Sequence, residues 1–137
     1  MDDDASIGGD MQIYVAHNFN AREWLPLVVD RIQAAGHPVT STWIYDDAHA
    51  SGGSRLTSAL VDIADIDRSA CLVLFTDQYG ETPGKGKYFE LGYAYAQQKR
   101  IILVGKDTIT CVFYALPGVE RVANEDELIT LLKKEKA

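Results

Sequence analysis

The residues with the clearest chemical potential are two carboxylates, Asp62 and Glu90, which stand on either side of residues 70–87. Residues 70–75 are a continuous apolar run, and residues 76–87 are a polar loop rich in glycine. The loop leads into a segment of helical composition, and Glu90 falls in its expected first turn. A helix dipole favours an ionised carboxylate at that position, which is the form that a nucleophile needs.

Each residue of chemical interest also has a structural interpretation. Glutamate is common in first helical turns because it suits the dipole, so Glu90 needs no catalytic role. Asp62 could be a solvent-facing helix residue, as at least one of Asp65 and Asp67 should be. Tyr14 could belong to the core, because tyrosines suit strands. Trp43 is better explained as a core residue than as a platform for a nucleobase. The elements that position these side chains therefore have to be considered.

Segments with β-strand and helix patterns alternate along the chain. We expect strands at residues 11–16, 37–44, 70–75, 100–104 and 118–122, and helices at residues 21–35, 56–68, 88–98 and 124–134. Gly36 should end the first helix, and Asn124 with Glu127 should form a capping box on the last. This alternation is typical of a flavodoxin-like doubly wound α/β sandwich, here with a mainly parallel five-stranded sheet in the order 2-1-3-4-5. We expect a single domain over residues 11–137, after a disordered acidic tail at residues 1–10.

Folds of this kind bind ligands at the carboxyl ends of their parallel strands. Residues 16–20, residues 76–86 and the start of the helix that carries Glu90 should meet there. A loop at residues 45–54 is long enough to be functional. The residues expected to contact a substrate are His17, Asn18, Phe19, Asp77, Gly84 and Gly86.

The composition excludes several classes of function. The net charge of −7 argues against a nucleic-acid polymer or an anionic membrane as partner, because both call for a basic face. The two cysteines give neither a disulfide framework nor a zinc site, and no signal peptide is evident, so we expect a cytoplasmic protein without a metal. The glycine motifs of dinucleotide and phosphate-binding loops are missing, which gives no reason to expect a cofactor.

Three motifs in this order resemble the nucleoside 2-deoxyribosyltransferase superfamily, which includes the deoxynucleotide N-hydrolases. The first is the pair Ile13-Tyr14 in the first strand. The second is a D-[LI]-x-x-I pattern at residues 62–66, and the third is a G-x-x-x-E-L-G-x-A pattern at residues 86–94. The resemblance covers roughly residues 11–122.

The resemblance implies cleavage or transfer at the N-glycosidic bond of a small (deoxy)nucleoside or nucleotide. It implies that Glu90 attacks the anomeric carbon and forms a glycosyl-enzyme ester, that Asp62 protonates or holds the base, and that Tyr14 orients Glu90. Breaking the bond builds positive charge on the sugar and negative charge on the base, so one acid should face each.

Departures from the family pattern leave the substrate open. Gly84 stands where transferases tend to carry an acidic residue against the base, and residues 17–22 lack the serine- and arginine-containing phosphate loop of the hydrolases. Two other interpretations also remain, namely a non-catalytic nucleotide-binding or sensor module on the same fold, and an NAD-cleaving glycohydrolase.

The resemblance also implies a homodimer or higher homo-oligomer, because members of the family commonly dimerise. A neighbouring subunit often supplies a polar residue from the segment after the fourth strand, and residues 111–113 lack the usual Asn or Ser. Apolar residues in this part of the chain would suit a subunit interface, namely Val112, Phe113, Tyr114 and Leu116.

Overall fold

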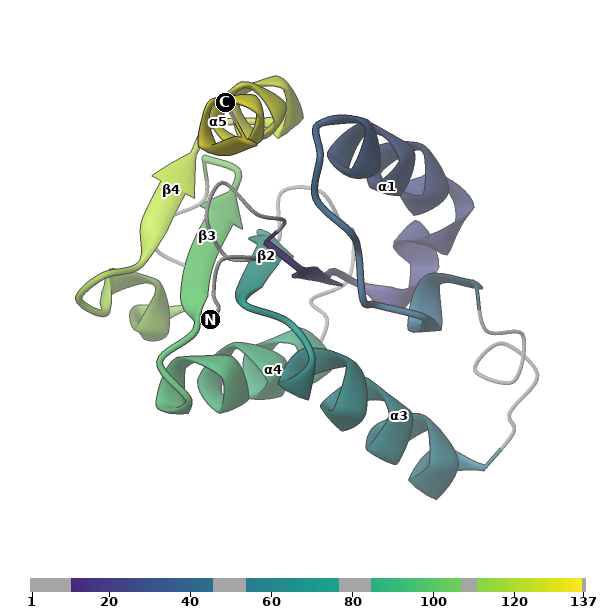
Figure 1. The fold of residues 1–137 in the computed structure, drawn as a ribbon. Helices are drawn as coiled ribbons and strands as arrows, with labels where there is room; N and C mark the ends of the chain where they lie inside the picture. Colours follow the sequence, from purple (N-terminus) through teal and green to yellow (C-terminus); the bar gives the residue numbers. More distant parts are fainter. Residues whose placement is uncertain (1–10, 46–53, 77–84, 107–110, 137) are drawn as a thin grey trace, which may run out of the picture.

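The computed structural model describes residues 11–45, 54–76, 85–106 and 111–136 of the chain (Figure 1). In this part of the chain, four parallel strands form one sheet in the order β1-β2-β3-β4. The strands are β1 (Ile13–Ala16), β2 (Cys71–Phe75), β3 (Arg100–Val104) and β4 (Glu120–Val122). The α/β class with a parallel sheet is confirmed, whereas the expected tail at residues 1–10 lies outside the described residues.

Helices cover both faces of this sheet. They are α1 (Leu25–Ala34), α3 (Arg55–Asp67), α4 (Lys85–Ala96) and α5 (Glu125–Lys136), with short 3-10 helices η2 (Phe19–Glu23), η3 (Trp43–Tyr45) and η5 (Val112–Ala115). Figure 1 shows α1 and α5 packed on one face, and α3 and α4 on the other. Among the described residues, no helix is both long and apolar enough to cross a membrane.

The strand expected at residues 37–44 is absent, so the prediction of five strands in the order 2-1-3-4-5 is wrong. Only an isolated parallel bridge between Ile13 and Val39 remains of it. Side chains replace the next ladder bonds, because Val15 donates its backbone N–H to Ser41 Oγ (2.6 Å) and accepts a bond from Trp43 Nε1 (3.0 Å). The chain then turns into η3. Trp43 is a buried core residue, as expected.

Removing the Ser41 hydroxyl should destabilise the fold. Ser41→Ala leaves the buried N–H of Val15 without its acceptor, which should lower the free energy of unfolding by about 1–3 kcal/mol. Denaturant unfolding measures this change. Thr130→Ala on the exposed face of α5 is the control, and it should stay within about 0.5 kcal/mol of the parent protein. An equal effect of both substitutions would contradict the role given to Ser41.

The core forms where the apolar patterns predict it. Every residue of β2 is buried, as expected for its continuous apolar run, and Cys71 is a fully buried core residue. Gly36 follows α1 with φ of 103°, a conformation that glycine adopts without a steric penalty. At α5, Asn124 Oδ1 accepts the N–H of Glu127 (2.9 Å), while Glu127 Oε1 accepts that of Ala123 (2.8 Å).

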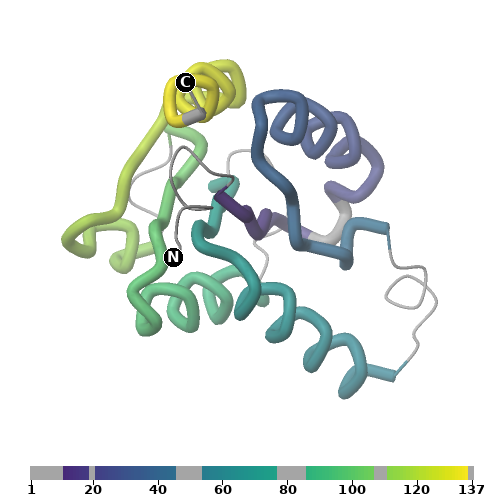
Figure 2. The backbone as a smooth tube through the Cα atoms, viewed as in Figure 1, coloured from purple at the N-terminus to yellow at the C-terminus, as the bar shows by residue number. Residues whose placement is uncertain are grey.

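Helix α3 is buried mainly near its carboxyl-terminal end. Leu56, Leu60, Ile63 and Ile66 share one face of the helix by their spacing, but both leucines are exposed and Ile66 alone of the four is fully buried. Figure 2 shows that the amino-terminal turns of α3 extend away from the sheet. The helix therefore presents an apolar stripe with no core beneath its first half.

Candidate active site

Tyr14 and Glu90 meet across the interface of the sheet with α4. Tyr14 lies in β1 and is fully buried, and its hydroxyl donates a hydrogen bond of 2.7 Å to Glu90 Oε2. The two residues are 76 positions apart in the chain, so the contact depends on the packing of α4 against β1. It fixes one carboxylate oxygen of Glu90 and leaves the other available for chemistry.

Glu90 and Asp62 line the same cavity, which has a volume of about 350 Å³ and lies between α3 and α4. Its other walls are mainly apolar. The lining residues are Ala59, Asp62, Ile63, Ile66, Gly86, Phe89 and Glu90. A small, mainly apolar cavity with two convergent carboxyl groups has the composition of a small-molecule site.

Burial controls the protonation of Glu90. It raises the pKa of Glu90 from 4.5 to about 8; the hydrogen bond from Tyr14 opposes this rise, and the negative charge of Asp62 adds to it. The expectation that a helix dipole holds Glu90 ionised is wrong, because α4 begins at Lys85 and Glu90 falls in its second turn. The dipole acts mainly within the first turn. Burial therefore favours the neutral acid form of Glu90.

Tyr14 acts only as a donor in this pair. Its pKa is raised well above the ordinary value, first by burial and then by the charges of Glu90 and Asp62. The hydroxyl therefore keeps its proton at every physiological pH. A fixed donor stabilises the carboxylate form of Glu90 more than the neutral form, which is the direction that a nucleophile requires.

Removing the Tyr14 hydroxyl should impair a reaction that uses ionised Glu90. Tyr14→Phe removes a charge-assisted hydrogen bond to Glu90, so kcat/KM should fall by about 10- to 100-fold. Because this bond lowers the pKa of Glu90, the midpoint of the pH profile that reports on Glu90 should move to higher pH. The measurement is the pH profile of kcat/KM. Tyr95→Phe, which loses a bond to the Pro117 carbonyl instead, is the control and should leave the profile unchanged. An unshifted midpoint in Tyr14→Phe would contradict the role of this bond.

The residues expected to contact a substrate are only partly brought together. Gly86 lines the cavity beside Glu90. His17 and Asn18 are buried at the end of β1 but are not among the described residues that line this cavity, and the His17 ring stacks on Phe75 at 5.2 Å. Phe19 is the first residue of η2. Asp77 and Gly84 lie outside the described residues.

Two buried charged residues near the site were missed by the sequence analysis. Lys87 is 1% exposed and donates from Nζ to the carbonyl of Phe75 at the end of β2 (3.1 Å). No sequence signal indicates this, because lysine is rarely buried. Asp65 is 2% exposed, whereas Asp67 is exposed. The spacing of Asp65 and Arg68, which form an ion pair three residues apart, is a signal that could have found it.

Two solved structures share the fold. The Clostridium botulinum CMP N-glycosidase BcmB is 16% identical, with a TM-score of 0.63 over 90% of this chain and 98% of that chain. A conserved protein from Enterococcus faecalis V583 is 17% identical, with a TM-score of 0.66 over 92% and 99% of the two chains. Likenesses at these identities establish the fold alone. None of the curated proteins compared with this chain matches it.

The family profile described as nucleoside 2-deoxyribosyltransferase matches residues 13–129. The match includes β1 with Tyr14, α3 with Asp62, and α4 with Glu90. It therefore contains every element that contributes to the cavity and to the hydrogen bond described above. The chain belongs to the nucleoside 2-deoxyribosyltransferase family.

Proposed function

We propose that this chain cleaves or exchanges the N-glycosidic bond of a (deoxy)nucleoside or nucleotide, with Glu90 as the nucleophile. The observation that carries the proposal is the cavity that Glu90 shares with Asp62, while Tyr14 holds Glu90 from the sheet. Membership of the family supports chemistry at an N-glycosidic bond in general. The similarity in fold to a CMP N-glycosidase is consistent with it.

The proposed reaction has two steps. In the first, the ionised carboxylate of Glu90 attacks the anomeric carbon, the C–N bond breaks, and its electron pair leaves with the base. Asp62 donates a proton to the departing base, so the products are the free base and a glycosyl ester of Glu90. In the second step, water or a second base attacks the anomeric carbon and displaces Glu90, and Asp62 takes up the proton that the acceptor loses.

The reaction requires Asp62 to be protonated while Glu90 is ionised. Burial raises the pKa of Glu90, and the negative charge of Asp62 adds to this rise. The reactive form is the one with the proton on Asp62, facing the base, and the negative charge on Glu90, facing the developing positive charge of the sugar.

The test is release of free base from a panel of deoxynucleosides, deoxynucleoside monophosphates, ribonucleotides and NAD, each with and without a second free base. Release that requires Glu90 supports the proposal, and dependence on the second base distinguishes transfer from hydrolysis. Turnover of NAD alone would support the NAD-cleaving alternative. No turnover of any compound by the parent protein would overturn the proposal in favour of a binding module.

We also propose that the chain forms a homodimer. Large apolar side chains are exposed at two places, on α3 beside the cavity and on η5, and exposed apolar surface can mark an interaction site. These residues are Leu56, Leu60, Val112 and Phe113. Tyr114 was expected in the same interface, but it is buried in the core.

The dimer proposal is tested by light scattering after size-exclusion chromatography. Leu56→Glu should reduce the mass from that of a dimer to that of a monomer. Leu27→Glu on α1 is the matched control, since Leu27 and Leu56 are both 69% exposed, and it should remain dimeric. A parent protein that is monomeric at every concentration would contradict the proposal.

A further inference from the structure

We propose that Asp65 is a positioning residue for Asp62, because it fixes α3 to residues 40–42, which are themselves bonded to β1, and so holds Asp62 in place beside Glu90. The inference rests on the proposed function, in which Asp62 donates a proton to the departing base. Asp62 and Asp65 are three residues apart on α3, so they lie on neighbouring turns of one side of the helix. Asp62 faces the cavity, whereas Asp65 is buried beneath the helix.

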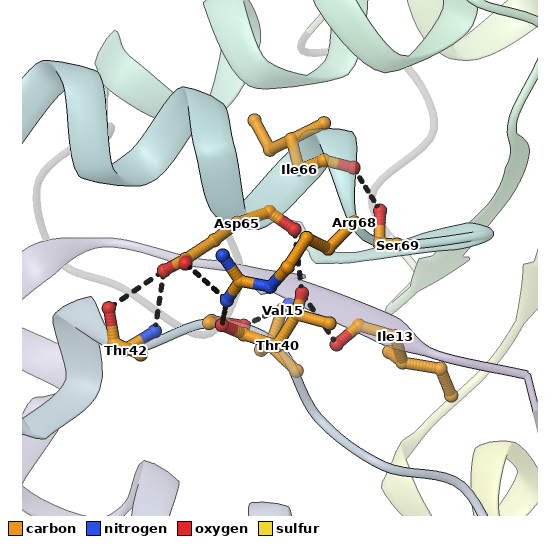
Figure 3. Close-up of polar contacts among 9 residues, drawn as sticks. Ile13, Val15, Thr40, Thr42, Asp65, Ile66, Arg68 and Ser69 are labelled. Carbon is orange, nitrogen blue, oxygen red and sulfur yellow. Dashed lines mark hydrogen bonds and ion pairs between the residues drawn. The ribbon is translucent and has the colours of Figure 1, made fainter.

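The Asp65 carboxylate is bonded through both oxygens (Figure 3). Oδ2 accepts the backbone N–H of Thr42 (2.9 Å) and the Thr42 hydroxyl (2.7 Å), and Oδ1 accepts a bond from Arg68 Nη2 (2.6 Å). The backbone carbonyl of Asp65 also accepts the Thr40 hydroxyl (2.9 Å). The last turns of α3 are thus tied to residues 40–42 by both the side chain and the main chain of one residue.

Residues 40–43 are in turn tied to β1. The side chains of Ser41 and Trp43 bond the N–H and the carbonyl of Val15, which directly follows Tyr14. Tyr14 then bonds Glu90. Three sets of hydrogen bonds, joined by short stretches of backbone, therefore connect Asp65 with residues 40–43, those residues with β1, and β1 with Glu90. Asp62 lies one turn of α3 from Asp65.

The reduced pairing at this edge of the sheet explains why such a connection is needed. Residues 37–44 would fix their own position through a ladder if they formed a strand, but the structure gives them one isolated bridge to β1. A buried carboxylate is costly, and an apolar side chain of similar volume often stabilises a core equally well. A fully bonded carboxylate at Asp65 instead specifies one geometry, because its hydrogen bonds are directional.

The experiment compares Asp65→Asn with Glu120→Gln, which weakens an ion pair to Arg100 (2.6 Å) near β3 and β4 and away from the cavity. Base release is measured for substrates with one sugar and bases of different leaving ability. Asp65→Asn should lower kcat by about 10²-fold for the poorest leaving bases and by only a few-fold for the best, with KM nearly unchanged. A substitution that only destabilises the fold lowers base release from every substrate by the same factor, and this is the result expected for Glu120→Gln. A uniform loss in Asp65→Asn would overturn the inference.

A second measurement does not depend on turnover. Carboxyl ¹³C NMR follows the titration of Asp62 in the parent protein and in both variants. The same titration is followed in Thr42→Val, which keeps the charge of Asp65 and removes its hydrogen bond from the Thr42 hydroxyl. Thr42→Val should move the Asp62 midpoint, whereas Glu120→Gln should not, and an unmoved midpoint in Thr42→Val would overturn the inference. If the parent protein releases no base but the Asp62 midpoint moves, the proposed function fails while the positioning of Asp62 by Asp65 stands.

Discussion

Replacing Glu90 by glutamine is expected to lower base release by at least about 10³-fold, because an amide cannot form the glycosyl ester. The substitution keeps the shape of the side chain, and its amide oxygen can still accept the hydrogen bond from Tyr14. The loss would therefore report on the carboxylate itself. Free base is followed by chromatography, with Glu23→Gln at an exposed position as the control of unchanged activity. Turnover that survives in Glu90→Gln would show that another residue is the nucleophile.

The same substitution is expected to make the protein more stable at alkaline pH. The folded chain keeps a proton on Glu90 up to about pH 8, whereas the unfolded chain releases it near pH 4.5. The free energy of unfolding therefore falls as the pH rises between these values, by at most about 1.4 kcal/mol per pH unit. Glutamine lacks this titration. Denaturant unfolding should show that the free energy of unfolding of Glu90→Gln increases relative to that of the parent protein from pH 5 to pH 8. For Glu23→Gln this difference should not change with pH.

The second large expected effect is on the pH dependence of the reaction. Since the reactive form of the pair holds one proton on Asp62 and a negative charge on Glu90, kcat/KM should be level just below the pKa of Glu90, which is about 8, and fall by up to about tenfold per pH unit above it, where that proton is lost. Asp62→Asn removes both the proton donor and a negative charge that raises the pKa of Glu90, so kcat/KM should be lower and should no longer fall above pH 8. Steady-state kinetics between pH 5.5 and pH 9.5 give both quantities.

Asp67→Asn is the control for the pH profile. Asp67 lies on the same helix as Asp62 but is exposed and bonds Tyr93 instead of facing the cavity, so its substitution should leave the midpoint in place. A profile of the parent protein that is flat through pH 8 would show that Glu90 does not enter the reaction as a carboxylate with a raised pKa.

Some features of the fold and site follow directly from the sequence. Only a strand covered on both faces makes use of five successive apolar residues, which is why β2 could be predicted from residues 70–75. The motif residues Tyr14 and Glu90 were expected near each other, and a hydrogen bond joins them. Their catalytic roles stay predictions, as does that of Asp62.

Other features depend on partners that no local pattern encodes. Residues 37–44 have a composition suited to a strand, but side chains of Ser41 and Trp43 take the backbone bonds of Val15 that such a strand would have used. The helical spacing of Leu56 and Leu60 predicts an apolar stripe but not where the sheet beneath it ends. The pKa of Glu90 could not be anticipated either, because it depends on burial under α3.

The side chains that bond Val15 have a consequence for the behaviour of the protein in concentrated solution. An edge strand with unpaired backbone groups is a template on which strands of other molecules can add, and this is a common route to aggregation. At β1 the hydroxyl of Ser41 and the indole of Trp43 already occupy the N–H and the carbonyl that an added strand would need. Pro38, whose carbonyl accepts the N–H of Ile13 at the same edge, has no backbone N–H to offer an incoming strand. This edge of the sheet is therefore protected from growth by hydrogen bonds within the molecule.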